Sequence, residues 1–440
     1  MNARVTGPIR IGLLGAGVVG EGILQLLSDN AGSIERRLGT AIEVRKIVAR
    51  NPNKARGPLL EGRVGYDPDE VLNDPEIDIV VEVMGGLEPA GDYVRRALEA
   101  DKSVVTANKA LLAEHGHALI ELSETRGVDL YFEAAVAGGI PVIRVLREAL
   151  AADTVTGLRG IVNGTSNYVL SEMRDRGVDF AVALADAQAA GYAEADPTLD
   201  VNGGDACHKL TILATLAFGA VVHPDDVQQE GIETIGAIDI AMARRFGYVI
   251  KPLAVGAERA DGTLDLRVHP ALVPETSVLA SIGGALNVVV LDGTMLGPCL
   301  LSGYGAGALP TAMSVVSDIV DVGRNLVSGS SGRVPQRAWR GEHLQSRPHA
   351  EPGAHVCQWY LRFSVLDRPG VLARIAGVLG AFDVSIEQMF QQGRGKESDA
   401  PVQVVMLTHE ARESDIRHAV REIEMLSGVV EPTRAIRIEP

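Results

Sequence analysis

Short apolar segments alternate with helical stretches over the first 130 residues of the chain. The segments rich in β-branched residues run from Ile9 to Leu14, Ile42 to Ala49, Ile77 to Val83, Ser103 to Thr106 and Val128 to Phe132. Such alternation is typical of consecutive βαβ units, whose strands form a parallel sheet. We therefore expect an α/β domain at the N-terminus.

A second pattern occupies the C-terminal part of the chain. Apolar and polar positions alternate at 361–365 and 402–406, and apolar residues recur at helical spacing at 371–379 and 416–423. Residues 435–438 close the pattern as a further strand. The order β-α-β-β-α-β predicts a small ferredoxin-like module.

The middle of the chain is mixed in character. An apolar helix is expected after Gly204, and strands are expected at 253–257 and 286–291. The uncharged run at 293–317 is interrupted by glycine and proline, so it predicts a packed loop followed by a helix and no membrane span. Residues 328–354 are rich in Ser, Gly, Pro and charge, which indicates a linker.

Composition narrows the class of protein. The chain has 440 residues, 46% hydrophobic and 22% charged, which excludes collagen, a coiled coil and whole-chain disorder. Its net charge of −16 argues against binding to nucleic acid or to anionic membrane surfaces. The N-terminus lacks the apolar core of a signal peptide, and the three cysteines form no metal-ligand pair. A cytoplasmic location is therefore expected.

A glycine-rich loop follows the first apolar segment and opens a helix. The loop consists of Gly15, Ala16, Gly17, Val18, Val19 and Gly20. In a G-x-G-x-x-G loop the first glycine permits a tight turn, the second lets the backbone approach a pyrophosphate, and the third allows close packing. Because free N–H groups at the helix start attract phosphate, we predict a dinucleotide site on a Rossmann-type sheet.

The residue after the second strand bears on the choice of dinucleotide. This strand is followed by Arg50, with Lys54 nearby, where an acidic residue would accept a hydrogen bond from an unphosphorylated ribose. A guanidinium suits a 2′-phosphate, so the sequence favours NADP over NAD. The alternative is that Arg50 is an ordinary solvated loop residue.

An acidic and basic constellation is the most informative stretch. Asp205 follows two glycines at a helix start, and Lys209 lies four residues later on the same face. That face continues with Ile212, Leu213 and Leu216, so the ion pair is expected to be buried. A buried lysine has a tunable pKa, which a general acid/base requires. The alternative is a structural i,i+4 salt bridge.

Two further residues carry possible chemistry. Lys109 falls just past the carboxyl end of a predicted parallel strand, at the edge where α/β sheets bind ligands, although a surface lysine at a helix start is the simpler interpretation. Cys207 points about 200° away from the face of Asp205 and Lys209, so we predict a packed residue and not a nucleophile.

Taken together, these segments resemble homoserine dehydrogenase over nearly the whole chain. The resemblance rests on the loop at 15–20, Thr106-Ala-Asn-Lys109, Asn163-Gly-Thr-Ser-Asn-Tyr168, the block from Glu194 to Lys209, and Gly303 to Thr311. The C-terminal module resembles an ACT domain, with Asp367-Arg-Pro-Gly370 at its first strand-to-helix turn. With no kinase-sized segment before the glycine loop, the monofunctional form is expected.

The resemblance implies an oxidoreductase that transfers hydride reversibly between L-homoserine and L-aspartate 4-semialdehyde with NAD(P). It implies that Lys209 exchanges the hydroxyl proton as general acid/base, with Asp205 positioning substrate and Lys209. It places Lys109 between nicotinamide and substrate, and Glu194 on the substrate ammonium. The pathway implied is the biosynthesis of threonine, methionine and isoleucine.

Other expected roles follow from the same resemblance. Further substrate contacts are Asp200, Gly164 and Thr165. Further cofactor contacts are Arg50, Gly85, Thr106 and Gly307. A monovalent cation would lie on Glu133 and on the carbonyls of Val136, Gly138 and Ile140, with a structural glutamate as an equal alternative. Family members usually have glycine where this chain has Ala308, so a β-carbon must fit beside the nicotinamide.

The resemblance also implies an organisation in domains. A dinucleotide-binding domain at 1–135, joined by about 305–327, precedes an α+β substrate and dimerisation domain at 136–304. The linker at 328–354 leads to the ACT domain at 355–440. We expect a homodimer or homotetramer, and feedback inhibition by L-threonine through Asp367 and Gly370, the alternative being an ACT domain used only for assembly.

Two competing hypotheses are kept. Another Rossmann dehydrogenase with an ACT domain, such as a prephenate or phosphoglycerate dehydrogenase, would place a histidine at its centre, whereas this chain offers lysines. A non-catalytic sensor of dinucleotide or amino acid would bind NADP without turnover.

Overall fold

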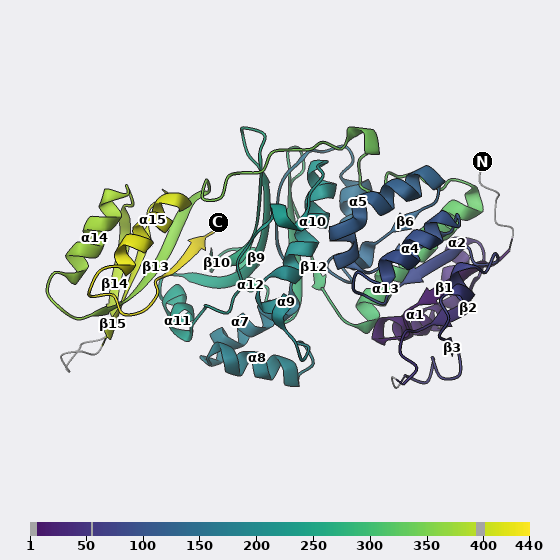
Figure 1. Ribbon diagram of the computed structural model, residues 1–440, viewed down its shortest axis with the longest axis horizontal. Helices are drawn as coiled ribbons and strands as arrows, with labels where there is room; N and C mark the ends of the chain where they lie inside the picture. Colours follow the sequence, from purple (N-terminus) through teal and green to yellow (C-terminus); the bar gives the residue numbers. More distant parts are fainter. Residues whose placement is uncertain (1–6, 54–55, 393–400) are drawn as a thin grey trace.

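The computed structural model describes residues 7–53, 56–392 and 401–440. Three parts lie in a row along the long axis of the molecule (Figure 1). A parallel-sheet domain lies at one end, a mixed domain in the middle, and a small C-terminal module at the other end. No helix of the described residues is long and apolar enough to span a lipid bilayer.

The N-terminal domain is built on a six-stranded parallel sheet with the order β3-β2-β1-β4-β5-β6. Its strands are β1 (Ile9–Leu14), β2 (Ile42–Val48), β3 (Val64–Gly65), β4 (Ile79–Glu82), β5 (Ser103–Thr106) and β6 (Leu130–Tyr131). Its helices are α1 (Val18–Asp29), α2 (Ala31–Leu38), α3 (Asp69–Leu72), α4 (Ala90–Glu99) and α5 (Lys109–Arg126), and α13 (Ala308–Ser328) returns to pack on α1. This order is that of a Rossmann fold, which confirms the predicted class.

The strands of this sheet are buried on both faces, which explains their continuous apolar character. Ile9, Ile11 and Leu13 pack toward α1 and α13, whereas Leu14 and Val80 pack toward α4 and α5. The strand bounds predicted for β1 and β5 are confirmed, and the other three strands are one to three residues shorter than predicted.

The middle domain carries an antiparallel sheet with the order β12-β11-β7-β9-β10. Its strands are β7 (Val155–Ile161), β8 (Gln228–Gln229), β9 (Tyr248–Glu258), β10 (Leu264–Pro274), β11 (Leu286–Gly293) and β12 (Gly297–Tyr304). Its helices are α6 (Val142–Arg144), α7 (Gly164–Arg176), α8 (Phe180–Ala189), α9 (Thr198–Val201), α10 (Gly204–Phe218), α11 (Ala237–Arg245) and α12 (Val278–Ser281), with a π-helical turn at Val145–Ala149. Helix α10 is the predicted apolar helix, and it packs on both β7 and α5.

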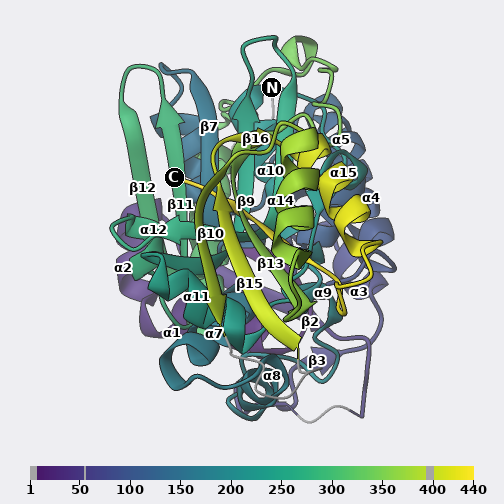
Figure 2. The ribbon, with the colours of Figure 1, turned by 90° about the vertical axis from the view of Figure 1, so that its left-hand side faces the viewer.

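The C-terminal module has the predicted β-α-β-β-α-β order, with an additional two-residue strand, β16, before its second helix. Its elements are β13 (Val356–Leu366), α14 (Val371–Ala381), β14 (Ile386–Gln392), β15 (Pro401–Thr408), β16 (Ala411–Arg412), α15 (Glu413–Glu424) and β17 (Arg434–Ile438). Helices α14 and α15 cover one face of its sheet (Figure 2). Strand β17 also pairs in parallel with β10, so the module extends the sheet of the middle domain.

Two segments differ from what composition suggested. Within 293–317 a loop was expected before the helix, but residues 297–304 form the edge strand β12, whose side chains alternate between half-buried and exposed. The predicted linker at 328–354 has only a 3₁₀ turn at Gly341–His343, yet it packs closely: Trp339 Nε1 donates to Leu216 O at 2.8 Å, and Gln336 is buried. Residue composition indicates a flexible segment, but it does not reveal contacts between that segment and the rest of the fold.

A buried carboxylate fastens the module to the middle domain. Asp239, in the first turn of α11, accepts hydrogen bonds from Tyr360 Oη at 2.9 Å and from Arg362 Nε at 2.6 Å, both on β13. Asp239 is fully buried and Arg362 nearly so. Each charge depends on the other for compensation, because water does not reach them.

We predict that Asp239→Ala lowers the free energy of unfolding by about 3 to 5 kcal/mol, since it leaves the Arg362 guanidinium buried without a counter-ion. Thermal and urea unfolding measure this effect. Asp29→Ala, which removes an exposed aspartate, should change stability by less than about 0.5 kcal/mol. Equal stability of the two variants would contradict the fastening role.

Candidate active site

The glycine loop has the geometry that phosphate binding requires. Gly15 has a φ of +123°, and a β-carbon there would lie 2.7 Å from the Val83 carbonyl oxygen. A β-carbon on Gly20 would lie 2.3 Å from the Gly15 carbonyl oxygen, so the third glycine permits close packing. At Gly17, which precedes α1, no atom lies within 4 Å of an added β-carbon. The open space at this helix start is where a phosphate group would fit.

The side chain of Glu82, at the end of β4, organises the neighbouring loop. It is fully buried, and its Oε1 accepts from the backbone N–H of Met84 at 2.7 Å and of Gly85 at 3.2 Å. Its Oε2 accepts from Thr106 Oγ1 at 2.6 Å. Thr106 and Gly85, both predicted cofactor contacts, are thus held by one carboxylate. Glu82 was not predicted as a site residue, although an acidic residue that ends an apolar strand was a usable signal.

The other predicted cofactor residues lie around the same edge of the sheet. Arg50 is exposed two residues beyond β2, and Lys54 lies outside the described residues. Gly307 precedes α13 with a φ of +119°, a left-handed conformation that favours glycine. Ala308 is the first residue of α13 and has no such φ, so its β-carbon is accommodated without backbone strain.

A buried aspartate between two lysines forms the centre of the site. Asp205 Oδ2 lies 2.6 Å from Lys209 Nζ, and Asp205 Oδ1 lies 3.1 Å from Lys109 Nζ. Lys209 also donates to the Val162 carbonyl at 2.7 Å. Asp205 and Lys209 come from α10, whereas Lys109 begins α5 of the N-terminal domain. The ion triad therefore joins the two domains.

Burial and charge shift the titration of all three groups. Burial would raise the pKa of Asp205, but the ammonium groups of Lys209 and Lys109 hold it well below its ordinary value. Burial lowers the pKa of Lys209, and Asp205 only partly offsets this. The half-exposed Lys109 has a raised pKa, chiefly because of Asp205. Of the two lysines, Lys209 is therefore the one that loses its proton more readily.

Asn163 links a second acidic residue, Asp200, to this triad through hydrogen bonds. Its Nδ2 donates to Asp205 Oδ2 at 2.8 Å and to Asp200 Oδ1 at 2.7 Å. Its Oδ1 accepts from the backbone N–H of Ser166 and so caps α7. Burial raises the pKa of Asp200, with a further increase from Asp205. Asn163 was not predicted as a site residue, although asparagine at a helix start is a typical N-cap.

The remaining predicted substrate contacts lie at the start of α7 and on the loop before α9. Thr165 is buried and donates through Oγ1 to the Tyr192 carbonyl at 2.7 Å, and Gly164 precedes it in α7. Glu194 is exposed, and its carboxylate makes no hydrogen bond or ion pair to any described residue. It is near enough to Lys109 to raise the pKa of that group. The Glu194 carboxylate is therefore available to bind a cation.

The predicted cation ligands form a different arrangement. Glu133 is buried, and its two oxygens accept from the backbone N–H groups of Ile143 at 2.9 Å and Arg144 at 2.8 Å. The carbonyl of Gly138 accepts from Ser314 Oγ at 2.7 Å, and that of Ile140 accepts from the Val142 N–H at 2.8 Å. Glu133 thus has a structural role at the start of α6, while Val136 lies just before the left-handed pair Ala137 and Gly138. The cation remains a prediction.

Two other predicted features can be placed. Cys207 is buried, its Sγ lies 3.5 Å from the Pro224 carbonyl oxygen, and burial raises the pKa of its thiol to about 11. This confirms the prediction of a packed residue, since a thiol of such pKa is a poor nucleophile. Asp367 and Gly370 are exposed at the turn before α14, in the module at the far end of the molecule (Figure 1).

Comparison with known proteins identifies the family of this chain. The family model described as homoserine dehydrogenase matches residues 141–320, that of its NAD binding domain matches 15–133, and that of the ACT domain matches 359–427. A homoserine dehydrogenase of Pseudomonas aeruginosa is 44% identical, covering 98% of this chain and 99% of its own. That of Neisseria gonorrhoeae is 43% identical with the same coverage.

Solved structures lead to the same conclusion. The crystal structure of a homoserine dehydrogenase from Thiobacillus denitrificans has a TM-score of 0.93 and 44% identity, covering 99% of both chains. A hyperthermophilic archaeal homoserine dehydrogenase in complex with NADPH has a TM-score of 0.61 and 25% identity, covering 72% of this chain and 97% of its own. With its Rossmann sheet, ion triad and C-terminal ACT module, the chain belongs to the homoserine dehydrogenase family, whose members are NAD(P)-dependent oxidoreductases acting on a CH–OH group.

Proposed function

We propose that Lys209 is the general acid/base for reversible hydride transfer between L-homoserine and L-aspartate 4-semialdehyde. The observation that carries this proposal is the position of Asp205 between Lys209 and Lys109, at the junction of α10 and α5. The nicotinamide nucleotide, when bound, accepts or supplies the hydride. The nucleotide would lie between the glycine loop and the residues that Glu82 holds, Gly85 and Thr106.

Each remaining residue has a role in this proposal. In the oxidising direction neutral Lys209 removes the proton from the hydroxyl oxygen of homoserine, and in reverse its ammonium returns it. Asp205 keeps Lys209 and Lys109 in place, while Glu194 binds the substrate ammonium. Asp200, Thr165 and Gly164 line the substrate position. Fixed orientation of substrate against cofactor supplies much of the rate.

We further propose that the enzyme prefers NADP and serves threonine, methionine and isoleucine biosynthesis. Arg50 lies just beyond β2 and supports the cofactor preference, because it is exposed and forms no ion pair with any described residue, so that it can pair with a 2′-phosphate. A homodimer or homotetramer is proposed from the edge strand β12, which exposes Leu300 and Tyr304. Sedimentation velocity distinguishes these assemblies.

We predict that purified protein reduces NADP faster than NAD with L-homoserine at alkaline pH, and that Lys209→Ala lowers kcat by about 10²- to 10⁴-fold, the range of general acid/base catalysis. Absorbance of the reduced nicotinamide follows the reaction. Lys46→Ala, which removes an exposed lysine on β2, is the matched control. Turnover that survives in Lys209→Ala would exclude Lys209 as acid/base, and faster reduction of NAD would reject the cofactor preference.

The pH dependence gives a second prediction. Homoserine oxidation requires neutral Lys209, so kcat should rise with pH through a pKa below the ordinary lysine value of about 10.4. Asp205 raises the pKa of Lys209, so Asp205→Asn should move the rising limb to lower pH while lowering the maximal rate. Profiles of kcat against pH for both proteins test this. A limb that stays in place or moves to higher pH would contradict the assignment.

We propose that L-threonine inhibits the enzyme by binding at the Asp367 to Gly370 turn of the ACT module. Deleting the module is an unsuitable test, because β17 pairs with β10 and its loss would expose that strand. Asp367→Ala should instead raise the threonine concentration for half-inhibition at least tenfold, each rate being compared with the same protein without threonine. Glu410→Ala, at another exposed acidic residue of the module, should leave inhibition unchanged. Full inhibition of Asp367→Ala would exclude this turn.

A further inference from the structure

A cavity lies between the C-terminal module and the middle domain, away from the ion triad. Its volume is about 490 Å³, within the range of small-molecule sites. One side is formed by α15 and the start of β17, and the other by β8 and β10. The cavity lies where the two parts of the extended sheet meet, so a ligand there would contact both.

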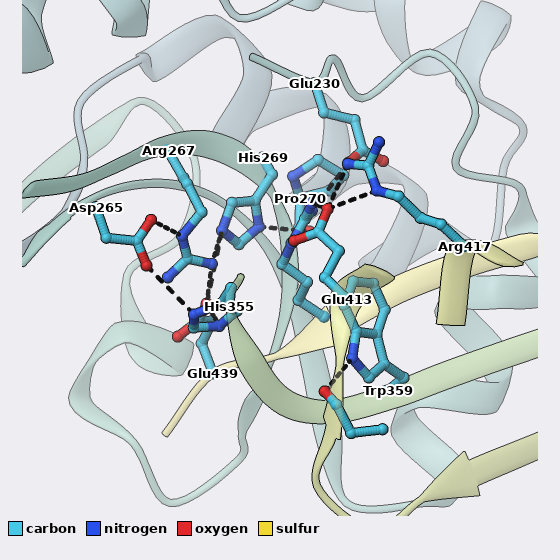
Figure 3. Close-up of polar contacts among 12 residues, drawn as sticks. Glu230, Asp265, Arg267, His269, Pro270, His355, Trp359, Glu413, Arg417 and Glu439 are labelled. Atoms are coloured by element: carbon cyan, nitrogen blue, oxygen red, sulfur yellow. Dashed lines mark hydrogen bonds and ion pairs between the residues drawn. The ribbon is translucent and has the colours of Figure 1, made fainter. Parts of the chain in front are cut away.

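Ion pairs around the buried Glu413 and Arg437 line this cavity. Arg437 Nη2 lies 2.6 Å from Glu413 Oε1, and Arg437 Nη1 lies 2.9 Å from Glu230 Oε2. Arg417 pairs with the same Glu413, and Figure 3 shows both side chains directed toward each other. Glu230 belongs to the middle domain, whereas Arg437 and Glu413 belong to the module. The positive charges of Arg437 and Arg417 are therefore compensated by Glu413 and Glu230.

A second buried network lies beside the first. Arg267 on β10 pairs with Asp265 at 2.9 Å and with Glu439 at 2.9 Å (Figure 3). His355 lies 3.4 Å from Asp265 and 3.5 Å from Glu439. Burial lowers the pKa of His269, so this ring adds no positive charge to the wall. The charge of Arg267 is therefore also compensated.

Two arginines of the cavity wall have no such partner. Arg421 on α15 and Arg434 at the start of β17 both line the cavity, and neither forms an ion pair with any residue that the structure describes. The Nε of Arg434 is buried without an acceptor. In a chain with a net charge of −16, two uncompensated guanidinium groups on one wall indicate an anion site.

The wall also offers a hydroxyl and an apolar surface. Thr433, next to Arg434, is 9% exposed, and its Oγ1 has no hydrogen-bond partner among the described residues. Buried polar groups are normally satisfied, so this hydroxyl is available to a ligand. Val268, Ile416 and Val420 line the same cavity. Guanidinium groups beside aliphatic side chains match a ligand with both a carboxylate and an aliphatic part.

We propose that this cavity binds a small organic carboxylate with an aliphatic side chain. Arg421 and Arg434 hold the carboxylate, Thr433 Oγ1 donates to it, and the apolar wall covers the aliphatic part. The site is distinct from the Asp367 to Gly370 turn, which does not line the cavity.

Isothermal titration of the full-length protein tests this site, without nucleotide or homoserine, so that its outcome is independent of catalysis. The probes are L-isoleucine, 4-methylpentanoate and inorganic phosphate. We expect at least one of the two organic carboxylates to bind saturably and to raise the melting temperature, because the ligand contacts only the folded, docked state. The double variant Arg421→Gln/Arg434→Gln should weaken this binding at least tenfold.

Controls separate the site from general effects. Arg374→Gln, on the exposed side of α14, should leave the affinity unchanged, and Thr433→Val should weaken it without loss of shape. Circular dichroism and unfolding curves show whether each variant is folded. The proposal is rejected if neither carboxylate binds, if the folded double variant binds with wild-type affinity, or if phosphate binds as tightly as the carboxylates.

Discussion

The arrangement of the active site depends on a single buried carboxylate shared by two ammonium groups. Asp205 and Lys209 belong to α10, but Lys109 belongs to the first turn of α5, so the pairing holds only while the two domains are in contact. A buried charge without its partner is costly. The ion triad therefore forms only when the two domains pack together, and the contact between α5 and α10 holds the start of α5 beside Asp205.

The same principle operates at the other end of the molecule. The module pairs its last strand with β10, and buried ions on both sides of that pairing, Asp239 with Arg362 and Glu439 with Arg267, come from different parts of the chain. A domain attached only by a flexible tether would not need such buried ion pairs to hold it in place. The module is thus a structural continuation of the middle domain, which it contacts through both β10 and α11.

Much of the fold could be predicted because it depends on local pattern. Strands β1 and β5, the glycine loop and the shared face of Asp205 and Lys209 follow from residue spacing alone. The pairing of β17 with β10 could not be predicted, since it joins residues more than 160 positions apart and leaves no periodic signature. Asn163 was not predicted for a similar reason: it contacts Asp200 and Asp205, which only tertiary packing brings together.

The connectivity of the sheet links the module to the ion triad. Strand β17 pairs with β10, β10 with β9, and β9 with β7. Strand β7 leads directly into Val162, whose carbonyl accepts from Lys209, and into Asn163, which contacts Asp205. A slip in strand register would turn buried side chains such as Ile438 outward, so burial fixes the register of β17 on β10. The module and the ion triad are therefore joined by one continuous run of hydrogen-bonded strands.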